Sequence, residues 1–194
     1  MSGNPISTKI VLASTSPRRK ELLSQLGYQF SVVSPDIEEV KQDQESAQQY
    51  VERLSLEKAR AGLELSDASS VVIGSDTVVV LNGLVLEKPN DFEHAQAMLQ
   101  AMSGQKHQVL TAVSVVSQNK QSSVMVTTDV WFKALSEKEI EQYWLSGEPQ
   151  DKAGSYGIQG LGGRFVTRIE GSYYAVVGLP LYETDQLLQE FINN

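Results

Sequence analysis

The feature that most constrains the fold is an apolar run, Val71 to Leu81, with one carboxylate at its centre, Asp76. The valines and isoleucine of this run predict a long strand over residues 69–81. Asn82-Gly83 follows and predicts a tight two-residue hairpin, with residues 84–86 returning as a second strand. We therefore expect a long buried strand that carries an acid in its interior.

Asp76 is an anomaly in this run, because a carboxylate among valines must be paired, protonated or bound to a metal. Gly74 lies two residues before it and leaves space for the close approach of a ligand. Two interpretations are open: a functional carboxylate, or an Asp that caps the backbone at a strand bend. The cost of burying an unsupported carboxylate favours the functional interpretation.

A second stretch, residues 9–27, predicts a strand, a hydroxyl-rich turn and a helix. Residues 10–13 are apolar and partly β-branched, as in a short buried strand. Ser16 is a good N-cap, Pro17 suits the first helical position, and Gly27 stands where a helix C-cap is expected.

The first turn of this helix carries Arg18 and Arg19, although cations are unfavourable at the positive end of a helix dipole. A bound anion would reverse that effect. Free backbone amides, Ser14, Ser16 and the two guanidinium groups together suit a phosphate group. The alternative is a solvated helix start with two surface arginines.

The remaining pattern predicts further helices and strands. Strands are expected over 28–33, 108–116, 124–132, 165–169 and 173–177, and helices over 46–65, 91–102, from 136 and from 180. Lys58 falls within the apolar stripe of the helix 46–65, so it either snorkels along that face or points into a cleft. The glycine-rich segment 154–163 either lets backbone approach a ligand closely or is a mobile loop.

Charge and cysteine content exclude several classes of function. The chain has 24 acidic and 16 basic residues, which gives a net charge of −8. This charge argues against the binding of a nucleic acid polymer over a broad surface. The chain has no cysteine, which excludes disulfides, thiolate catalysis and cysteine-ligated zinc. The polar start, Met1 to Pro5, and the lack of a long apolar run predict a cytoplasmic protein without a signal peptide or membrane span.

The anomalous charges together suggest a reaction. Cations suited to phosphate oxygens stand beside acids suited to Mg²⁺, which suggests hydrolysis of a phosphoanhydride by an activated water. The cations are Arg18, Arg19, Lys58 and Lys88, and the acids are Glu38, Glu39, Asp76 and Glu87.

Four motifs resemble the Maf-like nucleoside triphosphate pyrophosphatases: residues 12–23, 74–77, 87–89 and 153–160. The resemblance runs from about Ile10 to the last helix. It implies a single domain over 1–194 with an α/β fold, in which helices flank an elongated mixed sheet and two lobes enclose a central cleft. It also implies cleavage of a nucleoside triphosphate to monophosphate and pyrophosphate with a divalent cation, Mg²⁺ or Mn²⁺.

The resemblance also implies roles for residues at matching positions. Asp76 resembles the proton acceptor that activates water, and Glu39 resembles the acid placed near the metal and that water. The phosphate-contacting positions correspond to Ser14, Arg19, Lys58 and Lys88.

Three further positions distinguish branches of the family, and here they are Arg18, Thr77 and Gln159, as in the branch that handles dTTP and UTP. A Gln amide has the donor and acceptor needed for the O4 and N3–H edge of uracil or thymine. Standard and modified pyrimidine nucleotides both remain open as substrates. The family's link to septum formation leaves open a role in division arrest, or a non-catalytic nucleotide-binding regulator. Family members are often dimers, so a homodimer is one expectation.

Overall fold

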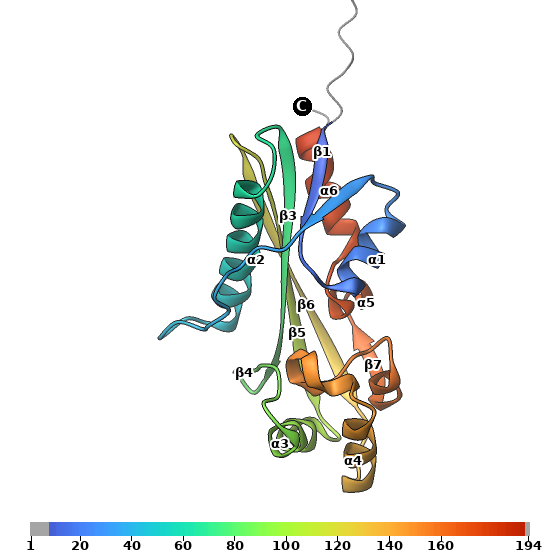
Figure 1. The fold of residues 1–194 in the computed structure, drawn as a ribbon. Helices are drawn as coiled ribbons and strands as arrows, with labels where there is room; N and C mark the ends of the chain where they lie inside the picture. The colour runs from blue at the N-terminus through green and yellow to red at the C-terminus, as the bar shows by residue number, and fades with distance from the viewer. Residues whose placement is uncertain (1–7, 193–194) are drawn as a thin grey trace, which may run out of the picture.

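The computed structural model describes residues 8–192, so the prediction for Met1 to Pro5 lies outside the described residues. The described chain forms a seven-stranded sheet in the order β2-β1-β3-β5-β6-β7, with β4 paired to β3 (Figure 1). The strands are β1 (Lys9–Ala13), β2 (Phe30–Val33), β3 (Ser70–Leu81), β4 (Leu84–Leu86), β5 (Lys106–Val116), β6 (Gln121–Phe132) and β7 (Val166–Glu170).

The sheet is mixed. β1 pairs in parallel with both β2 and β3, whereas β3, β5, β6 and β7 pair antiparallel in succession. The parallel arrangement needs crossover connections, and a helix lies in each of them. Of the antiparallel pairs, β3–β4 and β5–β6 are hairpins, whereas β3 reaches β5 through β4 and a helix, and β6 reaches β7 through a helix and 3₁₀ turns. The predicted α/β class and the elongated mixed sheet are therefore confirmed.

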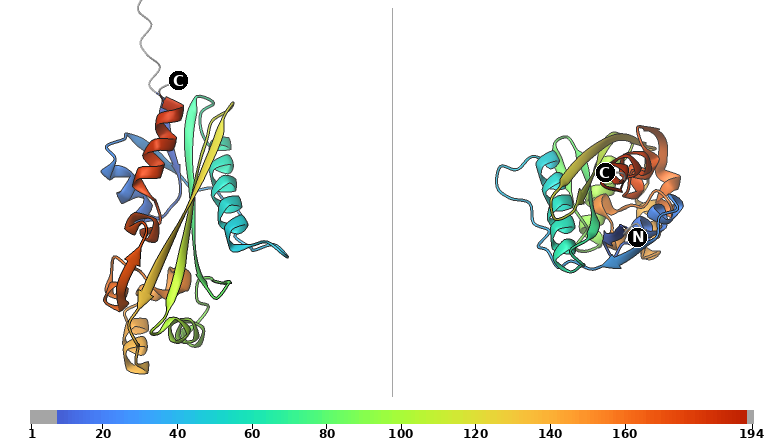
Figure 2. Two further views of the ribbon diagram at one scale, coloured as in Figure 1. Left: turned by 180° about the vertical axis from the view of Figure 1, so that it is seen from behind. Right: turned by 90° about the horizontal axis from the view of Figure 1, so that it is seen from above.

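Helices cover both faces of the sheet (Figure 2). α2 lies along one face, while α1, α5 and α6 lie on the other, and α3 and α4 gather at one end (Figure 1). Their bounds are α1 (Pro17–Gln25), α2 (Ala47–Glu64), α3 (Phe92–Met102), α4 (Glu137–Leu145), α5 (Tyr173–Val177) and α6 (Leu181–Ile192), with 3₁₀ turns η1 (Glu148–Asp151), η2 (Ala153–Ser155) and η3 (Leu161–Phe165). None of the helices in residues 8–192 is long and apolar enough to cross a membrane.

Separate apolar clusters form at the two ends of the sheet. One joins β1, α1 and α6 and includes Leu12, Leu23 and Leu188. Another joins α3, α4 and η3 and includes Leu99 and Phe165. Strands β3 and β5 contribute residues to both clusters, so the same long strands connect the two ends.

The predicted strand over 173–177 is wrong, because these residues form the helix α5. The Ser172 side chain caps it by accepting a hydrogen bond from the Ala175 amide at 3.1 Å, and Gly178 ends it with φ 130°. The aromatic and β-branched residues suggested a strand, but capping and tertiary contacts outweigh that propensity. The Ala175 carbonyl accepts a hydrogen bond from Thr111 on β5 at 2.6 Å, which fixes this turn against the sheet.

Candidate active site

Along one edge of β3, the pairing with β1 and the pairing with β4 leave a gap between them, and the site lies beside this gap. β1 pairs with β3 only as far as Ile73, and β4 begins its pairing at Val79. Between these points β1 has ended at Ala13 and the chain turns into α1. A cleft of about 390 Å³ opens here, beyond the carboxyl end of a parallel strand, where α/β sheets commonly bind ligands.

All nine residues to which the family resemblance gave a role line this cleft, whereas the other two acids, Glu38 and Glu87, do not. The nine residues come from the turn after β1, α1, the loop after β2, α2, β3, the loop after β4 and the segment between η2 and η3: Ser14, Arg18, Arg19, Glu39, Lys58, Asp76, Thr77, Lys88 and Gln159. Side chains far apart in the sequence are thus brought to one place.

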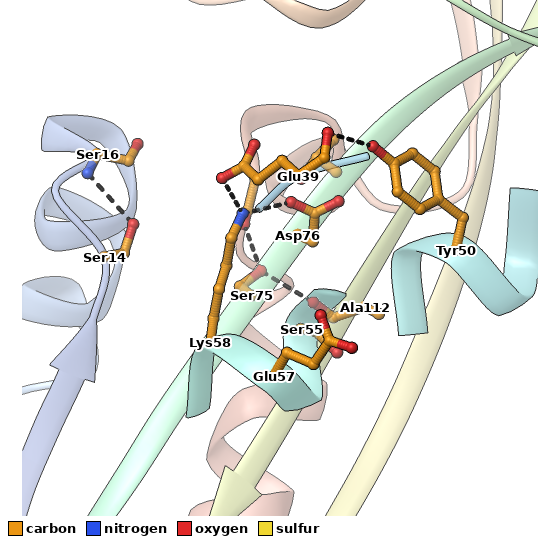
Figure 3. A network of polar contacts seen from close by, with 12 residues as sticks. Ser14, Ser16, Glu39, Tyr50, Ser55, Glu57, Lys58, Ser75, Asp76 and Ala112 are labelled. Atoms are coloured by element: carbon orange, nitrogen blue, oxygen red, sulfur yellow. Dashed lines mark hydrogen bonds and ion pairs between the residues drawn. The ribbon is translucent and has the colours of Figure 1, made fainter. Parts of the chain in front are cut away.

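Lys58, Asp76 and Glu39 form the polar centre of the cleft (Figure 3). The Lys58 Nζ atom lies 2.6 Å from Asp76 Oδ1 and 2.8 Å from Glu39 Oε1. Lys88 Nζ lies 3.7 Å from the other oxygen of Glu39. Lys58 therefore points into the cleft instead of snorkelling to the surface, and Asp76 pairs with it instead of capping a strand bend.

Burial and charge shift the pKa values of the two acids in opposite directions. Asp76 is only 6% exposed, and this burial raises its pKa above the usual range despite the nearby charges of Lys58 and Arg19. Burial also pushes the pKa of Glu39 upward, but the hydrogen bond and charge of Lys58, with Lys88, bring it below the usual value. The site thus holds one acid of high proton affinity beside one that stays ionised.

Alternation along β3 explains why Asp76 meets Lys58. Gly74 and Asp76 share one face of the strand, the face covered by α2. A Cβ at Gly74 would lie 2.2 Å from the Ser55 carbonyl oxygen of α2, so only glycine permits this close approach. The space predicted at Gly74 for a ligand is therefore occupied by the backbone of α2. This packing brings the ammonium of Lys58 to the carboxylate of Asp76.

The start of α1 confirms the predicted cap. The Ser16 side chain accepts a hydrogen bond from the Arg19 amide at 3.4 Å, and Ser14 Oγ accepts one from the Ser16 amide at 3.2 Å. Two amides predicted to be free are thus already bonded to serine oxygens. The buried Ser14 hydroxyl keeps its proton for another acceptor, because its oxygen is the atom used in this bond.

The other face of β3 carries Thr77, whose hydroxyl belongs to a directed chain of hydrogen bonds. Thr111 donates to the Ala175 carbonyl, so the 3.0 Å contact between the two threonines is a bond donated by Thr77. Thr77 Oγ1 in turn accepts from Arg19 Nη2 at 3.1 Å. The oxygen of Thr77 is therefore left with acceptor capacity only.

Arg19 is held in place on two sides. Its Nε donates to the Gly178 carbonyl at 2.8 Å, and its Nη2 donates to Thr77. The Ser75 hydroxyl lies 2.9 Å from the same Gly178 carbonyl and 3.0 Å from the Ala112 carbonyl, and its one proton is shared between these two acceptors. The guanidinium is thus aligned at the cleft before any ligand binds.

The chain is similar to known proteins over nearly its whole length. The family described as Maf-like protein matches residues 9–191. The chain belongs to the Maf family. It is 72% identical over 186 residues to the dTTP/UTP pyrophosphatase of Vibrio parahaemolyticus, covering 96% of this chain and 98% of that relative.

Other relatives of this Maf protein bear the same name. The dTTP/UTP pyrophosphatase of Vibrio vulnificus is 72% identical over 184 residues, covering 95% of this chain and 99% of the relative. That of Vibrio cholerae is 67% identical over 184 residues, covering 95% and 98%. The similarity therefore extends over nearly the whole length of each protein.

The structure of this Maf protein also contains supporting contacts that sequence reasoning missed. The Tyr50 hydroxyl lies 3.0 Å from the Glu39 carbonyl oxygen and 3.2 Å from Glu87 Oε1, so it ties the acidic loop to the segment after β4. Tyr50 falls within the predicted helix 46–65, but nothing in the sequence pattern singles it out. Glu87, one of the acids that the sequence suggested for the reaction, makes this contact with Tyr50. Glu38, another of those acids, is exposed.

Proposed function

We propose that this protein is a nucleoside triphosphate pyrophosphatase that hydrolyses dTTP and UTP to the monophosphate and pyrophosphate. One observation carries the proposal: a buried carboxylate of raised pKa, Asp76, lies in a cleft rimmed by cations. A carboxylate of high proton affinity suits a general base, and the cations suit the charges of a triphosphate. The names of the Vibrio relatives support the same reaction.

In the proposed mechanism, Asp76 takes a proton from the attacking water. Its Oδ1 accepts the hydrogen bond from Lys58, which orients the carboxylate and leaves Oδ2 to receive that proton. The water oxygen bonds to phosphorus as the anhydride bond between the α- and β-phosphates breaks. Pyrophosphate leaves with the electron pair of the broken bond.

The triphosphate would be held by the cations and the hydroxyl around the carboxylates. Arg19 presents a guanidinium already aligned by Gly178 and Thr77, and Ser14 presents a free proton. Lys58 and Lys88 complete the set and neutralise charge that develops on the leaving group. We assign all four residues to phosphate binding.

Glu39 and Asp76 fit a divalent cation that arrives with the substrate. No group of three or more acidic or histidine side chains suited to a metal occurs within residues 8–192. Mg²⁺ commonly binds through one or two carboxylates together with substrate phosphates, and this pair meets that need. When bound, Mg²⁺ or Mn²⁺ would supply Lewis-acid polarisation of the phosphoryl group.

We assign recognition of the base to Arg18, Thr77 and Gln159. The Gln159 amide can donate to O4 and accept from N3–H of thymine or uracil. Thr77 adds an acceptor, because its proton is used on Thr111. This set of groups favours a base edge that carries an N–H between carbonyl groups.

The test is an assay of purified protein with Mg²⁺ or Mn²⁺ and each common NTP and dNTP, in which pyrophosphate and orthophosphate are detected separately. The proposal predicts pyrophosphate as the main product, released mainly from dTTP and UTP. Orthophosphate as the main product, or release that favours purine nucleotides, would refute it. Binding without any release would favour the non-catalytic regulator.

A further inference from the structure

A single carboxylate, that of Glu148, lies at the centre of the glycine-rich segment that carries Gln159. Glu148 Oε2 accepts a hydrogen bond from the Leu161 amide at 2.8 Å. Glu148 Oε1 accepts one from the Gly162 amide at 3.0 Å and one from the Tyr143 hydroxyl at 2.7 Å. Both carboxylate oxygens are therefore occupied by donors, two of them amides of this segment.

Tyr143 holds the other side of the same segment. Its hydroxyl accepts a hydrogen bond from the Gly157 amide at 3.0 Å while it donates to Glu148. Gln159 lies between these anchor points, two residues after Gly157 and two before Leu161. The side chain of Tyr143 is fully buried against Phe165, so its hydroxyl is fixed by the core.

The glycines of the segment allow this arrangement. A Cβ at Gly160 would lie 2.2 Å from Glu148 Oε2, and one at Gly162 would lie 2.5 Å from the Tyr143 hydroxyl. The backbone thus wraps the carboxylate too closely for any side chain. This contact accounts for Gly160 and Gly162, while Gly154 packs against Val79 and Gly163 against the Ile158 carbonyl. The close approach predicted for this segment is therefore made, at Gly160 and Gly162, to side chains of the protein itself.

The carboxylate of Glu148 is held in its ionised form. Burial pushes its pKa upward, but the hydrogen bonds from Gly162, Tyr143 and Leu161 bring that pKa below the usual value. Charge-assisted bonds from amides to an ionised oxygen are stronger than neutral ones. The anchor therefore remains intact at neutral pH.

We propose that Glu148 and Tyr143 are positioning residues for base selection, which set the place of Gln159 in the cleft by anchoring the backbone on both sides of it. The inference rests on the proposed function. Gln159 itself is exposed and lines the cleft, so the position of its amide depends on the segment that carries it. Neither Glu148 nor Tyr143 lines the cleft, so neither is expected to touch the substrate.

The test uses Glu148→Gln and Tyr143→Phe, with Tyr28→Phe as the matched control. Tyr28 also donates to a carboxylate, that of Asp185 at 2.6 Å, but it does not line the cleft. We expect Glu148→Gln to place a side-chain amide donor against a backbone N–H group. Because this breaks a hydrogen bond of the anchor, the Leu161 and Gly162 amides should exchange their hydrogens faster than in the wild type.

The catalytic readout is the ratio of kcat/KM for dTTP to that for dCTP. This ratio should fall at least about 10-fold in Glu148→Gln and in Tyr143→Phe, as it should in Gln159→Glu, while the Tyr28→Phe control keeps the wild-type ratio. The two anchor substitutions should be non-additive in the double variant, because both break one unit.

Faster exchange with an unchanged ratio would overturn the inference, because it would make the anchor merely structural. Unchanged exchange would also overturn it. Failure of the proposed function is seen separately, as absence of pyrophosphate release from the wild type. In that case the same ratio is measured as equilibrium binding of dTTP against dCTP, which still decides whether the anchor acts.

Discussion

At the scale of single residues, Lys58 is the group on which the chemistry of the cleft depends. Its ammonium contacts both acids, at 2.6 Å from Asp76 and 2.8 Å from Glu39. The charge of Lys58 lowers the pKa of Asp76, while burial of Asp76 raises it further than Lys58 and Arg19 lower it. The proton affinity of Asp76 is thus set by burial on one side and by the charges of Lys58 and Arg19 on the other, and a substitution of Lys58 changes it.

The first prediction concerns the pH dependence of kcat/KM. Asp76 must be ionised to act as a base, so activity should fall as pH drops through its raised pKa. Lys58→Met should lower kcat/KM about 100-fold and move this acid limb to higher pH, because a charge that lowers the pKa is lost. The matched control is Lys88→Met, whose side chain is 62% exposed and pairs with Glu39 instead of Asp76.

For Lys88→Met we expect weaker activity with the acid limb near its wild-type position. An acid limb that stays in place in Lys58→Met, or moves to lower pH, would contradict the assigned balance at Asp76.

The residues of the site divide into those that sequence can predict and those that it cannot. A lysine in an apolar stripe and an acid in a valine run are costly, so Lys58 and Asp76 stand out without a structure. Glu148 follows a glycine and precedes a proline, where an acid is ordinary, and its importance lies in amides that reach it only in the folded chain. The specificity positions Thr77 and Gln159 came from the family resemblance, since nothing in their local pattern marks them.

At the scale of elements, the packing of α2 on β3 places the two halves of the charge pair. Gly74 lets the helix backbone approach, with a Cβ there 2.2 Å from the Ser55 carbonyl and 2.5 Å from the Ala59 amide. Gly62 on α2 lets the helix approach the neighbouring strand β1 closely as well, since a Cβ at Gly62 would lie 2.5 Å from the Cβ of Ala13. Two glycines thus set the spacing between helix and sheet.

The second prediction follows from this spacing. Gly74→Ala should destabilise the protein by about 3 kcal/mol or more, because the clashing atoms are backbone and cannot move alone. Its activity should fall further than its loss of folded protein accounts for, since α2 carries Lys58. Urea unfolding followed by circular dichroism, with kcat/KM of the folded fraction, measures both.

Gly83→Ala is the control for this substitution. Gly83 has φ +82° with no heavy atom within 4 Å of an added Cβ, so the cost should be about 1 kcal/mol, without an effect on activity. Equal stability losses at Gly74 and Gly83 would show that close packing of α2 is not the cause.

The type of each element, helix or strand, agrees with the local sequence pattern except where capping and tertiary contacts override that pattern. The sequence predicts a helix over 46–65 and strands over 108–116 and 124–132. The structure has these elements as α2, β5 and β6, with the two strands beginning two and three residues earlier than predicted. The segment 173–177 has strand-forming residues, yet Ser172 caps it as a helix against the sheet. Short segments are decided by such contacts, which no local pattern contains.

At the scale of the whole molecule, the long strands join both ends of the protein. β3 and β5 supply residues to the cluster around Leu12 and to the cluster around Phe165. The cleft lies beside the open edge of β3, between the end of β1 and the start of β4. We propose that the chain behaves as a single domain for this reason.

The third prediction is that the protein unfolds in one transition. Trp131 on β6 and Trp144 on α4 report on the end of the sheet near α3 and α4, whereas far-ultraviolet circular dichroism reports on every element. Both signals should give the same urea midpoint. Separate midpoints would indicate that the two ends unfold independently.

We propose that Asp76 activates water in a cleft that binds a nucleoside triphosphate. The most direct test is Asp76→Asn, measured for pyrophosphate release from dTTP and for dTTP binding. Turnover should fall about 10²- to 10⁴-fold while binding persists, because the amide keeps the shape of the side chain but accepts no proton. Asp129→Asn, which removes a carboxylate 2.9 Å from Lys106 outside the cleft, should retain wild-type turnover. Near-normal turnover in Asp76→Asn would exclude Asp76 as the base that activates water.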